Sequence, residues 1–241
     1  MPPETILAEL RKTLKGLASP KKAKVLASFF KTGPGEYAEG DIFLGITVPQ
    51  QRAVAQKFLG LSLSDIAALL QSPVHEERLT ALIIFVGQFQ KADNAGREAI
   101  AAFYLKNLKR VNNWDLVDLS AHQILGAHLY QQSRGIDVLL HLARSSNLWE
   151  RRVAMVSTFY FIRRKSSKEA MSVAELLLGD GQDLMHKAVG WMLRDVGKHA
   201  SEEALEEFLP RHHKTMPRTA LRYAIERFHS RKRLAYLSGR I

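Results

Sequence analysis

The sequence Asn147-Leu148-Trp149-Glu150-Arg151-Arg152 begins one of five strongly apolar segments that recur along the chain. The other four begin near Val74, Trp114, Asp183 and Thr215, so successive starts lie roughly 32 to 40 residues apart. Shorter amphipathic helices are expected between them, at 135–144, 167–178 and 202–209. Repeats of this length, each a pair of helices, are typical of an α-solenoid, because one pair cannot bury its apolar face without a neighbour.

Apolar residues follow a helical spacing along nearly the whole chain, as Ile6, Leu10 and Leu14 do near its beginning. No sustained alternation of apolar and polar residues bounded by hairpin turns is present, so no strand is expected. The breaks between segments are short, which favours one domain over residues 1–241. We therefore predict an all-α fold, an α-solenoid whose concave face would hold a large partner. An irregular helical bundle is the alternative, because the repeats are degenerate.

The composition is strongly basic. The 241 residues include 35 Lys+Arg and 24 Asp+Glu, a formal net charge of +11. This balance favours a polyanionic partner, because charge steers its approach and binding releases counterions. Basic clusters recur along the chain, which favours a folded positive surface over one basic tail: Lys21–Lys24, Arg151–Arg152, Arg163–Lys165, Arg211–Lys214 and Arg231–Arg233. A basic protein that binds no nucleic acid is the alternative.

Several other classes of protein are disfavoured by what the sequence lacks. The absence of cysteine excludes disulfides and thiolate metal sites, and it fits a reducing compartment. His75 is followed by no second histidine at helical spacing, and His212 and His213 are adjacent, so no metal and no cofactor is expected. No apolar run reaches the ~18 residues of a membrane span, and no secretory leader is present, so a cytoplasmic location is expected. Phosphate loops, nucleophile elbows and kinase signatures are also missing.

Each of the three tryptophans lies beside charged residues near the start of an expected helix. Trp114 and Asp118 are four residues apart, so they share one face of a helix. An aromatic face and a carboxylate can together stabilise a cation. A buried tryptophan beside a surface carboxylate is the structural alternative.

Lys187, Trp191 and Arg194 share a helix face in the same way. Gly190 precedes the tryptophan in mid-helix, where glycine costs about 0.5–1 kcal/mol relative to alanine. A glycine at this position indicates close approach, either by a neighbouring helix or by a ligand backbone. Arg152 in the preceding repeat could bind phosphate oxygens through its planar guanidinium. These groupings suggest chemistry on a nucleic acid.

Four motifs, in this order and spacing, resemble a known family: Phe43–Pro49 followed by Arg52, Trp114–Asp118, Asn147–Trp149 with Arg152, and Lys187–Arg194. The chain resembles the AlkD-type bacterial DNA glycosylases, the HEAT-like DNA alkylation repair enzymes, over nearly its whole length. The resemblance implies an α-solenoid of HEAT-like helix-pair repeats with a concave, basic DNA-binding surface. It also implies a monofunctional enzyme that hydrolyses the N-glycosidic bond of alkylated, positively charged purines. The bases implied are chiefly 3-methyladenine and 7-methylguanine, removed without the base flipping that most glycosylases use.

The same resemblance implies roles for individual residues. Asp118 matches the catalytic carboxylate, Trp114 and Trp191 match tryptophans that contact the deoxyribose of the lesion, and Arg152 matches a DNA-backbone contact. Further DNA-binding residues are expected at Lys187, Arg194, Arg52, Phe29 and Thr47. The implied partner is double-stranded DNA with alkylated bases, bound by a monomer with no obligate protein partner and no membrane association. The implied location is the bacterial cytoplasm, at the nucleoid when DNA is bound.

The chain departs from the family pattern in two places. Phe29 and Thr47 stand where the best-known member has a tyrosine and a glutamine that approach the DNA. Phe29 keeps a ring without the hydroxyl, and Thr47 is shorter than glutamine. The segment from Gly33 to Gly40 has no clear counterpart; we expect a solvent-exposed turn, and a DNA-facing loop is the alternative.

Two other functions fit part of the sequence. A helical-repeat module could bind distorted DNA without cutting the glycosidic bond, because phosphate contacts and catalysis use separable residues. A repeat scaffold for acidic protein partners fits the charge and the repeats but leaves Trp114, Asp118 and Trp191 unexplained. Because sites rather than folds decide function, this grouping favours the glycosylase.

Overall fold

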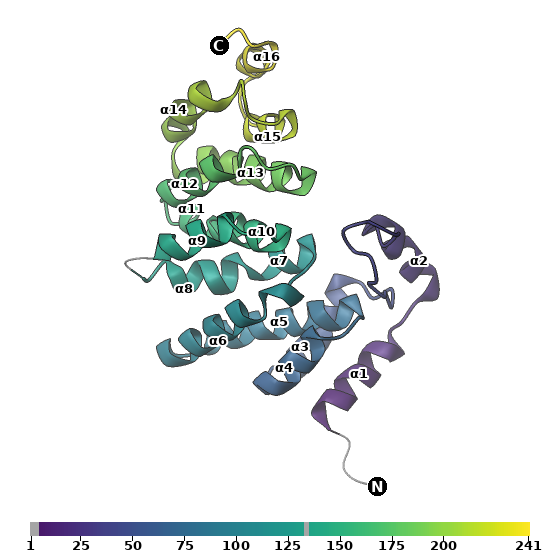
Figure 1. The fold of residues 1–241 in the computed structure, drawn as a ribbon. Helices are drawn as coiled ribbons and strands as arrows, with labels where there is room; N and C mark the ends of the chain where they lie inside the picture. Colours follow the sequence, from purple (N-terminus) through teal and green to yellow (C-terminus); the bar gives the residue numbers. More distant parts are fainter. Residues whose placement is uncertain (1–4, 133–134) are drawn as a thin grey trace. The chain divides into compact units, whose positions relative to one another are not determined.

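The computed structural model describes residues 5–132 and 135–241, and their regular structure is helical (Figure 1). The described residues form no strand, and extended backbone pairs only in an isolated parallel bridge between Ile42 and Val74. The predicted all-α class is therefore confirmed. In the described ranges no helix combines the length and apolar character needed to cross a membrane.

Most predicted helix starts agree with the structure. Helices begin at His75, Trp114, Leu148 and Asp183, at or next to the predicted positions. The last predicted start, near Thr215, is three residues early, since the helix begins at Arg218. Pro217 explains the difference, because a proline suits the residue just before a helix and disfavours helical backbone at the residue that precedes it. The intervening helices predicted at 135–144, 167–178 and 202–209 are also present.

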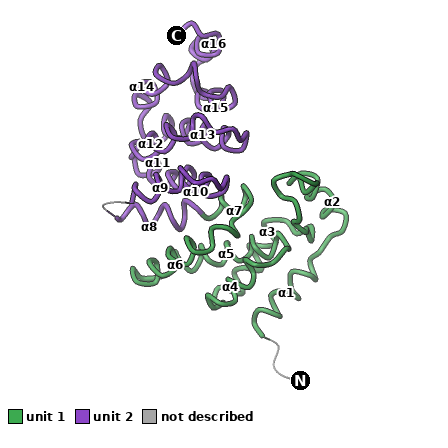
Figure 2. Tube along the Cα trace, in the orientation of Figure 1, with its two compact units in different colours: residues 1–120 green, residues 121–241 purple. Residues whose placement is uncertain are grey.

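The helices form two compact units, residues 1–120 and 121–241 (Figure 2). The prediction of a single domain over 1–241 stays a prediction. Unit 1 contains α1 (Ile6–Gly16), α2 (Pro20–Phe29), α3 (Val48–Lys57), α4 (Leu63–Leu70), α5 (His75–Lys91), α6 (Asn94–Lys106), η1 (Leu108–Arg110) and α7 (Trp114–Ser120). Helix α5 is central, because it packs against α3, α4, α6 and α7 and is buried along most of its length.

A tight segment in unit 1 explains the motif at Phe43–Pro49. Gly45 has φ +82, and a Cβ there would lie 2.3 Å from the carbonyl oxygen of Ser19. The buried carboxylate of Glu76 accepts hydrogen bonds from the backbone N–H groups of Leu44, at 2.9 Å, and Gly45, at 2.8 Å. Only glycine fits this conformation and spacing without strain, so this part of the motif has a structural reason.

Unit 2 repeats the helix-pair arrangement. Its elements are the π-helical turn η2 (His122–Gly126), α8 (Ala127–Leu129), α9 (Gly135–Ala143), α10 (Leu148–Ser157), α11 (Phe159–Ile162), α12 (Lys168–Leu177), α13 (Asp183–Asp195), the π-helical turn η3 (Val196–Ala200), α14 (Glu202–His212), α15 (Arg218–Ala224) and α16 (Ser230–Ser238). Helix α10 packs against α9 and α13, and α13 packs against α12 and α15. Each pair thus covers the apolar face of the next, as a helical-repeat fold requires.

The structure decides which neighbour approaches Gly190. A Cβ at this position would lie 2.5 Å from the carbonyl oxygen of Ala220 and 2.5 Å from the Cβ of Tyr223. Both residues belong to α15, so the close approach is by a neighbouring helix. The glycine allows α13 and α15 to pack with their backbones nearly in contact.

We expect Gly190→Ala to reduce the free energy of unfolding by about 1–3 kcal/mol, because the methyl group would force α13 and α15 apart. Urea denaturation would measure this change. Gly179→Ala is the control, since nothing lies within 4 Å of a Cβ at Gly179, and its effect should stay within about 0.5 kcal/mol. Equal effects of the two variants would contradict the packing explanation.

Candidate functional site

Helix α7 presents Trp114 and Asp118 one turn apart, both half-buried. The side-chain oxygen of Asn113 accepts a hydrogen bond from the backbone N–H of Trp114 at 2.8 Å. This contact satisfies one of the N–H groups that a helix leaves unpaired at its start, so the helix begins at the tryptophan. The structure thus places the indole ring and the carboxylate on neighbouring turns of one short helix.

The indole of Trp114 is held against a stack of aromatic rings. Its ring lies parallel to Phe30, with centroids 5.2 Å apart and an interplanar angle of 11°. Phe30 in turn stacks on Phe43 at 5.0 Å, and Phe29 meets the indole edge-on at 6.0 Å. Such geometries favour a fixed ring orientation. Trp114 is therefore anchored by neighbouring rings and remains partly exposed.

The segment from Gly33 to Gly40 supports the same stack. Ala38 is 2% exposed and belongs to a buried apolar cluster with Phe30 and Phe43, against which Trp114 packs. The backbone of the segment from Gly33 to Gly40 turns through positive φ at Gly35 and Gly40. The expectation of a plain solvent-exposed turn is thus incomplete, because the segment also covers the aromatic rings behind Trp114.

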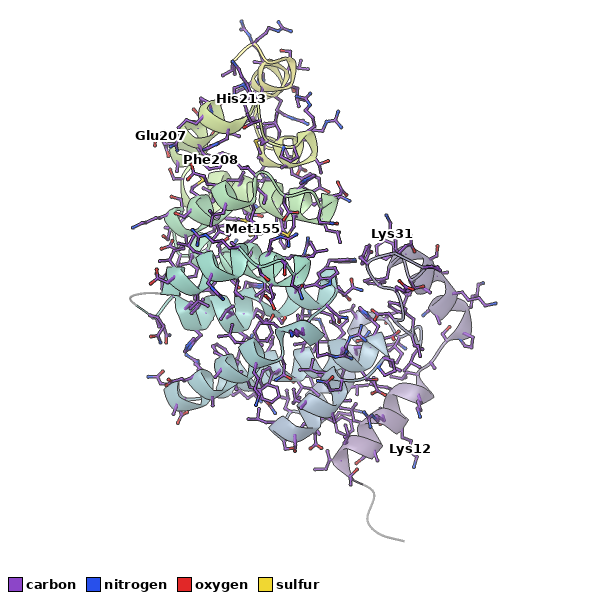
Figure 3. The ribbon with its side chains drawn as sticks, in the orientation of Figure 1. Lys12, Lys31, Met155, Glu207, Phe208 and His213 are labelled. Carbon is purple, nitrogen blue, oxygen red and sulfur yellow. The ribbon has the colours of Figure 1, made fainter. Side chains whose placement is uncertain are left out.

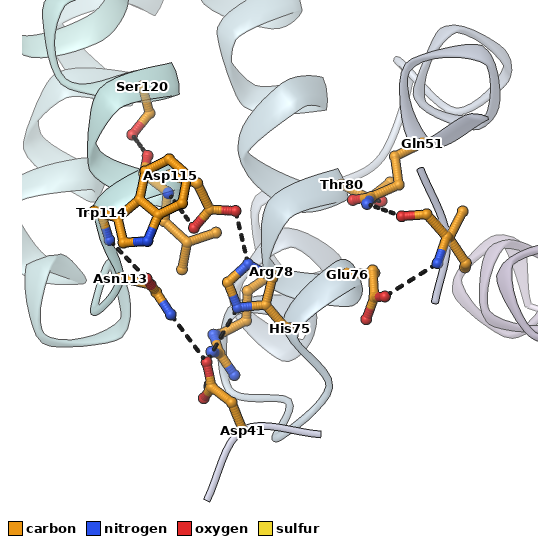
Figure 4. A network of polar contacts seen from close by, with 12 residues as sticks. Asp41, Gln51, His75, Glu76, Arg78, Thr80, Asn113, Trp114, Asp115 and Ser120 are labelled. Atoms are coloured by element: carbon orange, nitrogen blue, oxygen red, sulfur yellow. Dashed lines mark hydrogen bonds and ion pairs between the residues drawn. The ribbon is translucent and has the colours of Figure 1, made fainter. Parts of the chain in front are cut away.

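A buried network of charges holds the first turn of α7 to α5 (Figure 4). His75 lies between two carboxylates, with Nδ1 3.1 Å from Asp41 Oδ2 and Nε2 2.8 Å from Asp115 Oδ2. Arg78 donates from Nη2 to Asp41 Oδ1 at 2.6 Å and from Nη1 to the carbonyl oxygen of Ser72 at 2.9 Å. Because Asp115 follows Trp114 directly, the network fixes the backbone that carries the tryptophan.

Sequence reasoning missed this network, since it considered His75 only as a metal ligand. A usable signal was present: four ionisable residues, His75 to Arg78, stand directly before the longest apolar run. Charged residues in a buried helix are almost always paired. Within the described ranges no three histidine, aspartate or glutamate side chains are grouped as metal ligands.

Burial disfavours the protonated form of His75, but hydrogen bonds to Asp115 and Asp41 outweigh it and raise its pKa to about 9. For Asp41, burial favours the neutral acid, yet the hydrogen bond from His75 and the charge of Arg78 lower its pKa. The network therefore contains two cations and two carboxylates at neutral pH. A balanced set of charges with short hydrogen bonds can tolerate burial.

The raised pKa of His75 predicts that stability depends on pH. A raised folded-state pKa contributes stability that is fully present below pH 6.5 and is lost as pH rises through about 9. We expect the native protein to lose on the order of 2 kcal/mol over this interval relative to His75→Gln, which has no titrating ring. Urea denaturation of both proteins at several pH values would measure the difference. A difference in free energy of unfolding between the two proteins that stays constant with pH would contradict the raised pKa of His75.

The carboxylate of Asp118 has a buried phenol near it. Tyr104 is fully buried, and its hydroxyl lies 2.8 Å from Ser120 Oγ. Burial raises the pKa of Tyr104, the hydrogen bond with Ser120 lowers it, and the negative charge of Asp118 raises it further. The phenol therefore stays neutral beside Asp118.

In unit 2, Trp191 is half-buried on α13 and packs on Phe159 with ring centroids 5.9 Å apart. Lys187 Nζ lies 2.7 Å from Asp183 Oδ2, one turn earlier on the same helix. Arg194 Nη1 lies 2.5 Å from Glu226 Oε2. The structure thus brings Lys187, Trp191 and Arg194 onto one helix, with carboxylates beside both basic side chains.

Arg152 differs from the exposed phosphate clamp that its sequence position suggests. It is 4% exposed on α10, and its Nη1 donates to the carbonyl oxygen of Leu184 at 2.6 Å. This bond joins α10 to the first turn of α13. The predicted phosphate contact stays a prediction.

The remaining predicted DNA contacts lie in unit 1. Phe29 is 63% exposed at the end of α2, and Arg52 is exposed on α3. Thr47 is exposed, but its backbone N–H and hydroxyl both donate to Gln50 Oε1, at 3.0 and 2.7 Å, so it also caps α3. Unit 1 therefore holds Trp114, Asp118, Phe29, Thr47 and Arg52. Unit 2 holds Trp191, Arg152, Lys187 and Arg194.

Comparison with known proteins identifies a family and a similar solved structure. A family model described as DNA alkylation repair enzyme matches residues 10–228. A solved structure described as a predicted DNA alkylation repair enzyme from Enterococcus faecalis is similar with a TM-score of 0.70 and 18% identity, over 88% of this chain and 97% of that chain. No curated protein matches significantly. The structural likeness confirms the predicted fold, an α-solenoid of helix pairs.

Proposed function

The chain belongs to the DNA alkylation repair enzyme family, and from this premise we propose that it is a monofunctional DNA glycosylase. Its substrates would be alkylated, positively charged purines in duplex DNA, chiefly 3-methyladenine and 7-methylguanine. The observation that carries the proposal is the pair formed by Trp114 and Asp118, one turn apart on α7 and both partly exposed. A fixed aromatic face and a carboxylate suit a reaction in which a cation develops.

The chemistry of the lesion explains why few groups are needed. A cationic alkylpurine is already a good leaving group, so no general acid has to protonate it. As the N-glycosidic bond breaks, positive charge develops on the sugar as an oxocarbenium ion, as in glycoside hydrolysis. The released base takes the bonding electron pair and becomes neutral, and water then adds to the sugar and loses a proton.

In this proposal Asp118 stabilises the oxocarbenium ion and orients the attacking water. The face of Trp114 adds cation–π attraction. For Trp191 on α13 we propose a contact with deoxyribose. The stack behind Trp114 and the contact between His75 and Asp115 keep α7 in place, so little reorganisation is needed during the reaction. We propose that the lesion stays stacked, since the sugar rather than the base is recognised.

Release of the base from a duplex with one 7-methylguanine, measured under single-turnover conditions, tests the proposal. We expect release from this duplex and none above background from the same duplex with guanine, because a neutral purine is a poor leaving group. Tight binding of the lesion duplex without release would instead favour a module that only binds distorted DNA. If the protein neither bound this duplex nor released the base, DNA would no longer be the proposed substrate.

Arg152 is proposed to contact the DNA backbone. We expect Arg152→Ala to weaken binding for all DNA sequences and to reduce the slope of log K against log salt concentration by about 0.9, the value for one lost phosphate contact. Arg151→Ala is the control, because Arg151 lies next in the chain and pairs with Asp180 at 2.6 Å. An unchanged slope in folded Arg152→Ala would mean that the guanidinium does not contact phosphate.

A further inference from the structure

Most of the net positive charge of the chain is concentrated near its C-terminal end. Residues 210–241 contain nine lysines and arginines and one carboxylate, Glu226, so they carry about +8 of the total +11. The nine are Arg211, Lys214, Arg218, Arg222, Arg227, Arg231, Lys232, Arg233 and Arg240. The match to the family model ends at residue 228, so α16 lies outside the matched residues, whereas Arg222 and Arg227 lie within them.

This charge is carried by folded structure. Tyr236 of α16 is 3% exposed and packs against Phe228 and His213, with ring centroids 6.0 and 5.4 Å away (Figure 3 labels His213). Arg218 of α15 donates from Nη2 to the carbonyl oxygen of Leu237 at 2.9 Å. Helix α16 is therefore docked on unit 2, and its arginines have defined positions.

The basic residues of this region differ in whether they form ion pairs within the protein. Lys232 is paired with Glu206 and lies 4.4 Å from the ring of Phe228. Arg222, Arg227 and Arg231 are exposed, and within the described part of the chain no ion pair involves them. Arg227 also interacts electrostatically with Glu226. Exposed arginines on a rigid surface are the groups that bind phosphate oxygens.

A hollow next to these residues has three basic side chains in its lining. Its volume is about 260 Å³, and its charged lining consists of Arg194, Lys198, Arg227 and one carboxylate, Glu202. Arg194 is paired with Glu226, so Lys198 and Arg227 are the cations of the lining that would attract an anionic group. The hollow shares Arg227 with the exposed set, so the two features are continuous on unit 2.

We propose that Arg222, Arg227, Arg231 and the adjacent hollow form a second DNA-contacting surface, which binds the phosphate backbone of undamaged duplex. We name it the C-terminal basic surface. The choice of DNA as the polyanion rests on the proposed function. An anionic membrane fits less well, because a membrane-bound helix needs an apolar face, whereas on α16 the one large exposed apolar side chain is Leu234.

Backbone binding of this kind has defined consequences. It is independent of sequence and weakens steeply with salt, because each phosphate contact releases counterions. Such a surface would keep the protein on undamaged DNA between lesions and raise the rate of encounter with them. It recognises no lesion, so it should contribute equally to the binding of damaged and undamaged duplex.

The test is the triple variant Arg222→Gln/Arg227→Gln/Arg231→Gln in the full chain, with fluorescence anisotropy on an undamaged duplex over a range of salt concentrations. We expect the slope of log K against log salt to fall by about 2–3 and the affinity at low salt to fall on the order of 10- to 100-fold. The matched control is Lys91→Gln/Lys106→Gln/Lys109→Gln, which removes three exposed charges from unit 1. Circular dichroism would establish that both variants are folded.

An unchanged slope in the C-terminal triple variant would overturn the proposal, and so would an equal decrease in the control, since that would indicate net charge alone. Loss of binding to vesicles of anionic lipid, with DNA binding intact, would also overturn it in favour of a membrane. No excision is required in this experiment. Its failure is therefore separate from a failure of the native protein to release 7-methylguanine.

Discussion

Replacing Asp118 by asparagine is expected to slow the release of 7-methylguanine from duplex DNA by about 100-fold or more, while the affinity for that duplex changes little. Removal of one electrostatic stabiliser from a preorganised site commonly costs about 10²–10³ in rate. The amide keeps the shape of the side chain and loses the negative charge that would stabilise the oxocarbenium ion. The effect should therefore be confined to the chemical step.

Single-turnover release and equilibrium binding, measured on the same duplex, would separate these two effects. Glu98→Gln is a suitable control, because it also removes one carboxylate charge from unit 1 but at an exposed position on α6. Release by Asp118→Asn at the native rate would remove this carboxylate from the mechanism. A parallel loss of binding and release would assign Asp118 to DNA binding instead.

Arg78→Met is expected to destabilise the protein by about 3–5 kcal/mol, the range for breaking a buried ion pair by removal of one partner. Arg78 is 1% exposed and contacts both Asp41 and the carbonyl oxygen of Ser72. Without it, Asp41 and Asp115 share only the charge of His75, and the buried network carries an excess negative charge. Urea denaturation at neutral pH would measure the loss.

A double variant provides an internal check. Asp41→Asn added to Arg78→Met removes the excess charge and leaves His75 paired with Asp115, so the double variant should be more stable than Arg78→Met alone. Arg52→Met is the control, because Arg52 is exposed in the same unit and its loss should cost less than about 0.5 kcal/mol. A loss below about 1 kcal/mol for Arg78→Met would contradict the importance of the charge balance.

The network also links stability to the proposed site. His75 contacts Asp115, and Asp115 adjoins Trp114. We therefore expect Arg78→Met, which disturbs the charges around His75, to loosen the start of α7 as well. The aromatic stack of Phe30 and Phe43, which also contacts the ring of His75, supports the same indole. Neither support touches DNA in our proposal, yet both determine where the tryptophan face points.

The sequence by itself determined the helical fold. Apolar spacing and short breaks predicted the all-α class, the helix starts at Trp114, Leu148 and Asp183, and the stacking of helix pairs. These features are local, because a few neighbouring residues set the period of a helix and its ends. The pairing of Trp114 with Asp118 on one face also follows from local geometry, since residues four apart meet on any helix.

Only the tertiary structure decided what surrounds those helices. Periodicity gave no sign that Arg152 would be buried against Leu184, or that α15 rather than a ligand would approach Gly190. It also missed the network in which His75 joins Asp41 to Asp115, residues 34 and 40 positions away. Such contacts depend on which helices pack together, and helical spacing is the same whichever neighbour covers a face. The local pattern therefore determined the helices, and long-range packing determined which side chains are anchored, buried or exposed.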